Sequence, residues 1–148
     1  MITFHVFSLT LLLSLPLPLA SRIETAFLQN SPVLLRQLLT GEGTIPVSLP
    51  EPLDLADQLS PDQAFLVFDR IFSVFRTTEF TADSRLSARP GVAGGILKAR
   101  WSFRNDRTGN QYPLRVYFFV VPGPGQAGAG ARGPGMDLRI VEIRAERL

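Results

Sequence analysis

The chain has 148 residues, of which 45% are hydrophobic and 19% are charged, and its formal net charge is +2. This length and apolar content suffice for one domain with a buried core, which excludes a wholly disordered chain. The nearly balanced charge and the lack of a basic run argue against nucleic-acid binding. Cysteine is absent, which excludes disulfides, thiolate metal sites, cysteine nucleophiles and lipid attachment to cysteine.

The first 20 residues are predicted to be a signal peptide. An uncharged, leucine-rich run extends from Val6 to Leu19, and Ala20 and Ser21 separate it from the first arginine. Its length is typical of a signal-peptide apolar core and is short for a membrane span. We therefore expect residues 21–148 to form a single exported domain, periplasmic or extracellular. Retention of the leader as a membrane anchor and a wrongly chosen start codon are the alternatives.

Two segments after the leader have helical patterns. Residues 22–39 predict two short helices or one bent helix, because Ser31 and Pro32 interrupt apolar positions that are spaced as in a helix. Residues 60–63 form a capping-box sequence, and the helix that it opens is predicted to run to about Arg76. Apolar residues cover most of this helix, so we expect it to be buried on most of its surface.

Five segments are predicted to be strands: residues 45–49, 80–86, 96–104, 112–121 and 138–146. Pairing the third with the fourth across a turn at residues 105–110 places Trp101 opposite Leu114 and gathers the apolar residues on one face. The Gly/Pro-rich residues 122–136 are predicted to be a flexible loop.

A regular meander predicts how the last strand sits. Val141 and Ile143 then face inward, and Glu142 lies near Arg100 and Arg115, which face each other. The opposite face of the sheet gathers an apolar patch, which we take as the candidate interface: Tyr117, Phe119, Val121, Leu138 and Ile140.

Helices followed by a long antiparallel sheet indicate an α+β fold. The stretch from Gln63-Ala64 into Ile71-Phe72, and residues 95–97 and 139–144, resemble the nuclear-transport-factor-2-like superfamily. They are most similar to small exported bacterial proteins of that fold with unassigned function. The resemblance implies a cone-like curved antiparallel sheet with the N-terminal helices packed on its concave face, often around a pocket. Its members include isomerases, dehydratases, ligand binders and interaction modules, so the fold alone does not identify the function. Members of the superfamily often pair through the opposite face of the sheet.

The sequence lacks the usual residues of metal and triad chemistry. Its only histidine, His5, lies in the predicted signal peptide, which leaves the mature chain without histidine or cysteine. No EF-hand-like acidic motif is present. Residues 123–133 match a dinucleotide-binding glycine pattern twice, but a predicted strand follows them where that pattern needs a helix. We therefore predict no metal site, no cofactor and no catalytic residue.

The cone, if it holds a pocket, has five candidate lining residues: Phe72, Trp101, Phe103, Tyr112 and Leu114. Trp101 and Tyr112 are interpreted first as core residues. A superfamily enzyme would also need a carboxylate in the pocket, and Asp69, Glu79 and Asp83 are interpreted as surface acids. Arg100 and Arg115 could bind an anion, although a structural charge cluster with Glu142 is the preferred interpretation.

Our leading hypothesis is a non-enzymatic exported module that binds a small apolar ligand or a protein. Its partner would be a second copy of the chain or an envelope protein, with membrane contact only if the leader is retained. The alternative is a lyase- or isomerase-type enzyme that uses a carboxylate and a tyrosine in the cone.

Overall fold

The computed structural model describes residues 18–83, 85–89, 92–123 and 137–148. The helices are α1 (Leu19–Leu28), α2 (Pro32–Leu38) and α3 (Pro61–Val74). The strands are β1 (Ile45–Leu49), β2 (Leu55–Leu59), β3 (Phe75–Ala82), β4 (Ser87–Arg89), β5 (Val92–Asn105), β6 (Gln111–Pro122) and β7 (Leu138–Arg147). Most of the predicted signal peptide and of the predicted 122–136 loop lies outside the described residues.

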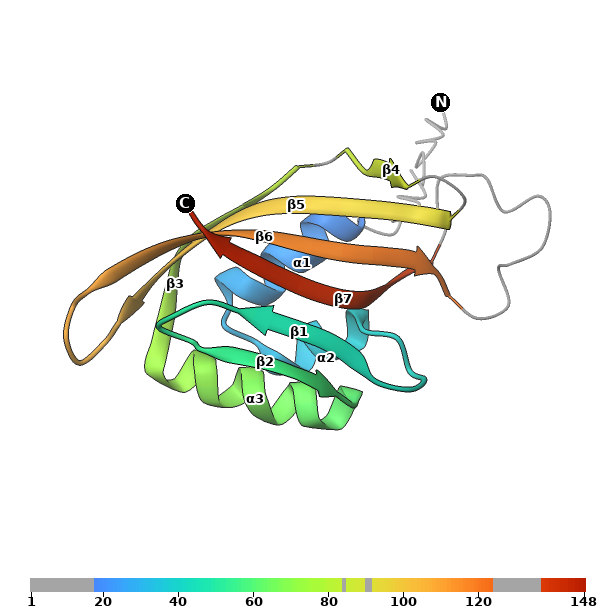
Figure 1. Ribbon diagram of the computed structural model, residues 1–148. Helices are drawn as coiled ribbons and strands as arrows, with labels where there is room; N and C mark the ends of the chain where they lie inside the picture. Colours follow the sequence, from blue (N-terminus) through green and yellow to red (C-terminus); the bar gives the residue numbers. More distant parts are fainter. Residues whose placement is uncertain (1–17, 84, 90–91, 124–136) are drawn as a thin grey trace, which may run out of the picture.

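The strands form one curved sheet with the order β2-β1-β7-β6-β5-β3, and β4 pairs with β5. The three helices lie on one side of this sheet, and the β1–β2 hairpin bends down toward α3 (Figure 1). This arrangement confirms the predicted α+β cone with its helices on the concave face. The sheet is mixed, however, because β1 runs parallel to β7, with Val47 beside Ile143. No local pattern could have predicted a pairing across so much of the chain.

The two predicted N-terminal helices are separate. The Ser31 hydroxyl accepts a hydrogen bond from the Leu34 amide at 3.1 Å, and Pro32 occupies the first turn of α2. Asn30, at the junction with α1, has a φ of +48°. This left-handed residue and the new N-cap end one helix and start the next.

The predicted capping box opens α3. Ser60 Oγ accepts from the Gln63 amide at 3.2 Å, and Gln63 Oε1 accepts from the Ser60 amide at 2.9 Å. The expectation that most of this helix is buried is wrong. Only Ala64, Phe68 and Ile71 are buried, while Leu66 is 64% exposed.

Strand positions around α3 differ from the prediction. The helix ends at Val74, and β3 starts at once with Phe75, where we expected a strand only from residue 80. β3 ends at Ala82, short of the expected end at residue 86, and the next strand, β4, begins at Ser87. β2 was missed because its two large apolar residues, Leu55 and Leu59, stand at its ends with only Ala56 as an apolar residue between them, which leaves no alternating signal.

The predicted register of the central hairpin is confirmed. Trp101 pairs with Leu114, and the neighbouring inward pairs follow as expected: Phe103 with Tyr112, Ala99 with Val116, and Leu97 with Phe118. Alternate residues of both strands are buried, so the two strands share one apolar face toward the helices.

A β-bulge changes the predicted register of the last strand. Phe118 pairs with Ile143 and Phe119 with Glu142, but Val120 pairs with Ile140, which leaves Val141 as an extra residue. One extra residue turns all preceding side chains to the other face. Ile140 is therefore fully buried and Leu138 packs against the core, so the prediction that both face outward is wrong.

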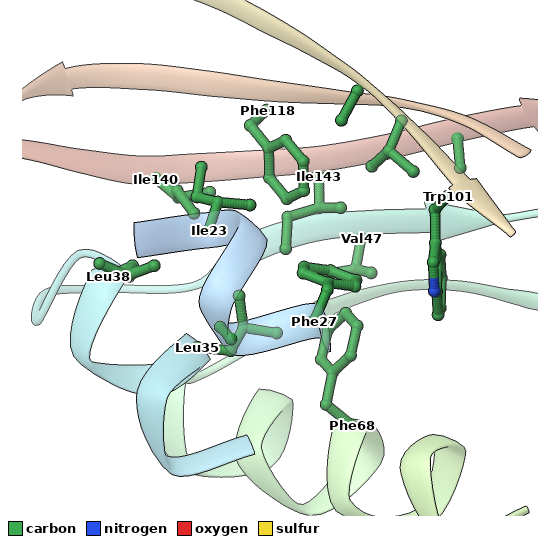
Figure 2. Close-up of a cluster of buried hydrophobic side chains, with 14 of the residues drawn as sticks. Ile23, Phe27, Leu35, Leu38, Val47, Phe68, Trp101, Phe118, Ile140 and Ile143 are labelled. Carbon is green, nitrogen blue, oxygen red and sulfur yellow. The ribbon is translucent and has the colours of Figure 1, made fainter. Parts of the chain in front are cut away.

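Helix α1 supplies the centre of the core. Figure 2 shows side chains of the three helices pointing toward those of the sheet, with Phe27 among them. The Phe27 ring lies 4.4 Å from Phe80, 5.0 Å from Trp101 and 5.8 Å from Phe118, measured between centroids. In the part of the chain that the structure describes, none of the helices is long and apolar enough to cross a membrane.

Candidate functional site

The predicted pocket residues lie at the core of the cone. Trp101 is 1% exposed, Phe103 0% and Leu114 1%. A side chain that lined a water-sized cavity would keep some accessible area, so these three residues border no such space. Phe72 and Tyr112 are partly buried and pack against the same core.

Aromatic rings occupy the position where a ligand would lie in an open cone. Trp101 contacts Phe103 at 4.4 Å and Phe72 at 6.4 Å between ring centroids, and Tyr112 stacks on Phe103 at 5.6 Å. The indole Nε1 of Trp101 donates to the Thr77 hydroxyl at 2.9 Å, so its one polar group is also satisfied inside the protein. Together these contacts describe a filled interior around Trp101.

Carboxylates are placed outside the cone. Asp69, Glu79 and Asp83 are all exposed, as the sequence suggested. Thr77 is the only buried polar side chain among the residues that the structure describes. The same residues include no group of three or more acids or histidines that could hold a metal ion. None of the three exposed acids is enclosed in the core with Trp101, whereas Glu24 of α1 is partly buried and its Oε1 accepts a hydrogen bond from the Ala82 amide at 2.8 Å.

The outer face of the sheet, opposite the helices, carries the other predicted site. Tyr117, Phe119 and Val121 point to this face from β6 and are partly exposed, and we call them the outer strip. Leu138 and Ile140 do not join it, because the bulge at Val141 turns them inward. The outer strip is therefore narrower than the sequence predicted.

Charged groups of both signs border the outer strip. The Tyr117 hydroxyl donates to Glu146 at 2.8 Å, and the Arg144 guanidinium lies 5.6 Å from the centroid of the Phe119 ring. Arg144 also pairs with Glu142 at 3.3 Å. The strip thus combines aromatic surface with an anion and a cation at short range.

The partner of Arg115 also differs from the prediction. Arg115 pairs with Glu146 at 3.7 Å, whereas Glu142 lies opposite Phe119. The error is one of register. β6 and β7 pair regularly from Leu114 to Phe119, and this pairing places Glu146, not Glu142, opposite Arg115. The segment between the two strands is too long for its sequence to fix their register.

The sequence matches no protein-family model, and no curated protein is significantly similar to it. Solved structures do resemble it. A ketosteroid isomerase-like protein from Erwinia carotovora atroseptica superposes with a TM-score of 0.61 at 12% identity, over 90% of this chain and 95% of that one. A nuclear-transport-factor-2-like protein of unknown function in nutrient uptake from Rhodospirillum rubrum superposes with a TM-score of 0.56 at 11% identity, over 86% of this chain and 93% of that one. A domain of unknown function with a cystatin-like fold from Nostoc punctiforme has a TM-score of 0.57 at 8% identity, over 86% of this chain and 72% of that one.

These likenesses show the fold of the protein. The chain has the nuclear-transport-factor-2-like fold, which confirms the resemblance inferred from its sequence. At such low identities the comparison shows the fold alone, and function has to be argued from the residues of this chain.

Proposed function

We propose that this chain is a non-catalytic protein-interaction module that acts as a homodimer through the outer face of its sheet. The observation that carries the proposal is the filled interior. Trp101, Phe103 and Leu114 together keep almost no accessible surface, so a ligand inside the cone could not contact them.

An isomerase or lyase would need a different interior. Such enzymes hold a carboxylate next to the substrate and shield it from water. Here Asp69, Glu79 and Asp83 are exposed, and no buried carboxylate is found among the described residues. The neighbour described as ketosteroid isomerase-like shares the fold, but none of the acids that the structure describes here is fully buried, as that chemistry would require.

The chemistry of the outer strip favours a second copy of the chain as its partner. A two-fold interface presents the same surface twice, so it needs self-complementary charges. Glu146 and Arg144 flank Tyr117 and Phe119, and a two-fold rotation can bring the cation of one chain to the anion of the other. Aromatic side chains with a polar rim are the residues that such interfaces favour.

The proposal also includes export. Its support is the apolar run that ends at Leu19, a few residues before the first arginine. Cleavage after Ala20 would remove the first two residues of α1, of which Ala20 is buried, and would keep Ile23 and Phe27, which are both buried more deeply. Most of the contribution of α1 to the core would therefore survive processing.

Sedimentation velocity of residues 21–148 tests the homodimer. We expect the parent protein to sediment as a dimer at high micromolar concentration and Phe119→Asp to sediment as a monomer, because the new charge would be buried at the interface. Leu66→Asp adds the same charge on the exposed side of α3 and should remain dimeric. A monomeric parent, or a dimer that Phe119→Asp leaves intact, would contradict the proposal.

A further inference from the structure

Two arginines of the outer face lie directly opposite each other. Arg100 of β5 pairs with Arg115 of β6, and like charges in this position repel. The positive charge of Arg115 is partly compensated, because Glu146 lies 3.7 Å from its guanidinium. Arg100 forms no ion pair with any residue that the structure describes. The pair therefore carries excess positive charge on an ordered pair of strands.

A shallow depression of about 410 Å³ contains this pair. Lys98 lies next to Arg100 on the same face, and Thr81 of β3 is directly opposite Arg100. Lys98 forms no ion pair with the residues that the structure describes, so it adds to the local positive charge. Three cationic side chains and a hydroxyl thus converge on one surface hollow.

Two acids, Glu79 and Asp83, also line the depression. Glu79 is opposite Ser102, two residues along β5 from Arg100. The Asp83 amide donates to the Lys98 carbonyl at 2.8 Å, and Asp83 Oδ1 accepts a hydrogen bond from the Arg85 amide at 2.9 Å. Neither comes within ion-pair distance of Arg100. Leu148 also borders the hollow. The two acids reduce the positive charge of the lining, and the three cations outnumber them.

We propose that Arg100 and Arg115, assisted by Lys98, bind a dianionic oxyanion group, either a phosphoryl group or a pair of carboxylates. A guanidinium is planar and presents paired N–H donors, so two opposed arginines can hold several oxygens of one anion. The anion would also offset the repulsion between the two arginines. The hydroxyl of Thr81 can donate one further hydrogen bond. The site adjoins the outer strip, since Lys98 is directly opposite Tyr117, but its argument does not require a dimer.

Titration followed by two-dimensional NMR tests the site. Inorganic phosphate and malonate are added separately to residues 21–148, at an ionic strength held constant with chloride. We expect saturable shifts centred on Arg100 and Arg115. Saturation by phosphate alone would assign a phosphoryl ligand, and saturation by malonate alone would assign a dicarboxylate. Saturation by both anions would assign the oxyanion chemistry that they share. Each of these three outcomes supports the proposal. Shifts that do not saturate with either anion would overturn it.

Variants assign the binding to the arginine pair. Arg100→Gln should weaken binding by about tenfold, the equivalent of one charge-assisted hydrogen bond. Arg104→Gln is the matched control: Arg104 lies on the same strand and face but is near Asp106, at 3.7 Å, so affinity should be unchanged. If Arg100→Gln does not fold, Lys98→Gln should weaken binding in the same direction. Equal affinities of the parent and of the folded Arg100→Gln and Lys98→Gln variants would overturn the assignment. The readout is anion binding, so a monomeric parent would refute the homodimer and leave this result intact.

Discussion

Ser60 and Gln63 satisfy each other's backbone amides at the start of α3. Replacing Ser60 by alanine removes the acceptor for the Gln63 amide, so the free energy of unfolding should fall by about 1 kcal/mol. Ser73→Ala is the control, because the Ser73 hydroxyl is exposed and donates only to the Arg70 carbonyl. Urea titration of both variants checks the prediction. An unchanged midpoint for Ser60→Ala would show that the capping box does not stabilise the helix.

Gly94 is required by both its conformation and its neighbours. Its φ is +95°, and a Cβ at this position would lie 2.1 Å from the carbonyl oxygen of Val120. Gly94→Ala should therefore lower the free energy of unfolding by roughly 2 to 5 kcal/mol, from backbone strain and overpacking combined. Gly109→Ala separates the two causes, since Gly109 has a φ of +76° but nothing within 4 Å of such a Cβ. Equal losses in thermal unfolding of the two variants would rule out the clash as a cause.

Helix α3 has one buried face and one exposed face, although its sequence is apolar almost all around. Phe68 is 1% exposed and Leu66 is 64% exposed, two residues away. Phe68→Ala should cost about 3 to 5 kcal/mol, because it empties part of the core. Leu66→Ala should change stability by less than about 0.5 kcal/mol, since it removes a side chain that is mostly in water. Chemical denaturation of the two variants measures the difference, and similar losses would mean that the helix is rotated from the orientation described.

The elements that the sequence predicted well are those with strong local signals. The capping box at Ser60 and the alternation that sets Trp101 opposite Leu114 each depend on residues close in the chain. The errors come from features without a local signal. Nothing in the sequence around Val141 marks a bulge, and the parallel pairing of Val47 with Ile143 joins distant segments. Both are decided by how the whole sheet closes over the helices.

At the scale of the whole molecule, composition restricts the chemistry but does not distinguish a pocket from a filled core. The chain has no cysteine, and its one histidine, His5, lies in the predicted signal peptide, which argues against most metal and nucleophile chemistry. Whether Trp101 lines a pocket or fills the core depends on Phe27, which α1 places 5.0 Å away. Helix α1 is far from Trp101 in sequence, so only the folded structure could choose between the two interpretations.

Homodimerisation predicts that the stability of the whole molecule depends on its concentration. When unfolding separates two chains, mass action raises the midpoint of thermal unfolding with protein concentration. For a chain of this size we expect a rise of about 2 to 3 °C for each tenfold increase. Differential scanning calorimetry over a hundredfold range measures the rise.

Phe119→Asp should remove this dependence, because the partly exposed outer strip would no longer pair with a second copy. Leu66→Asp should retain it, since Leu66 is on the helical side of the molecule. The comparison also separates loss of assembly from loss of folding. A variant that only weakens the monomer unfolds at a lower temperature but keeps the slope of midpoint against concentration. A parent whose midpoint does not change with concentration would mean that the outer strip pairs with no second copy of this chain.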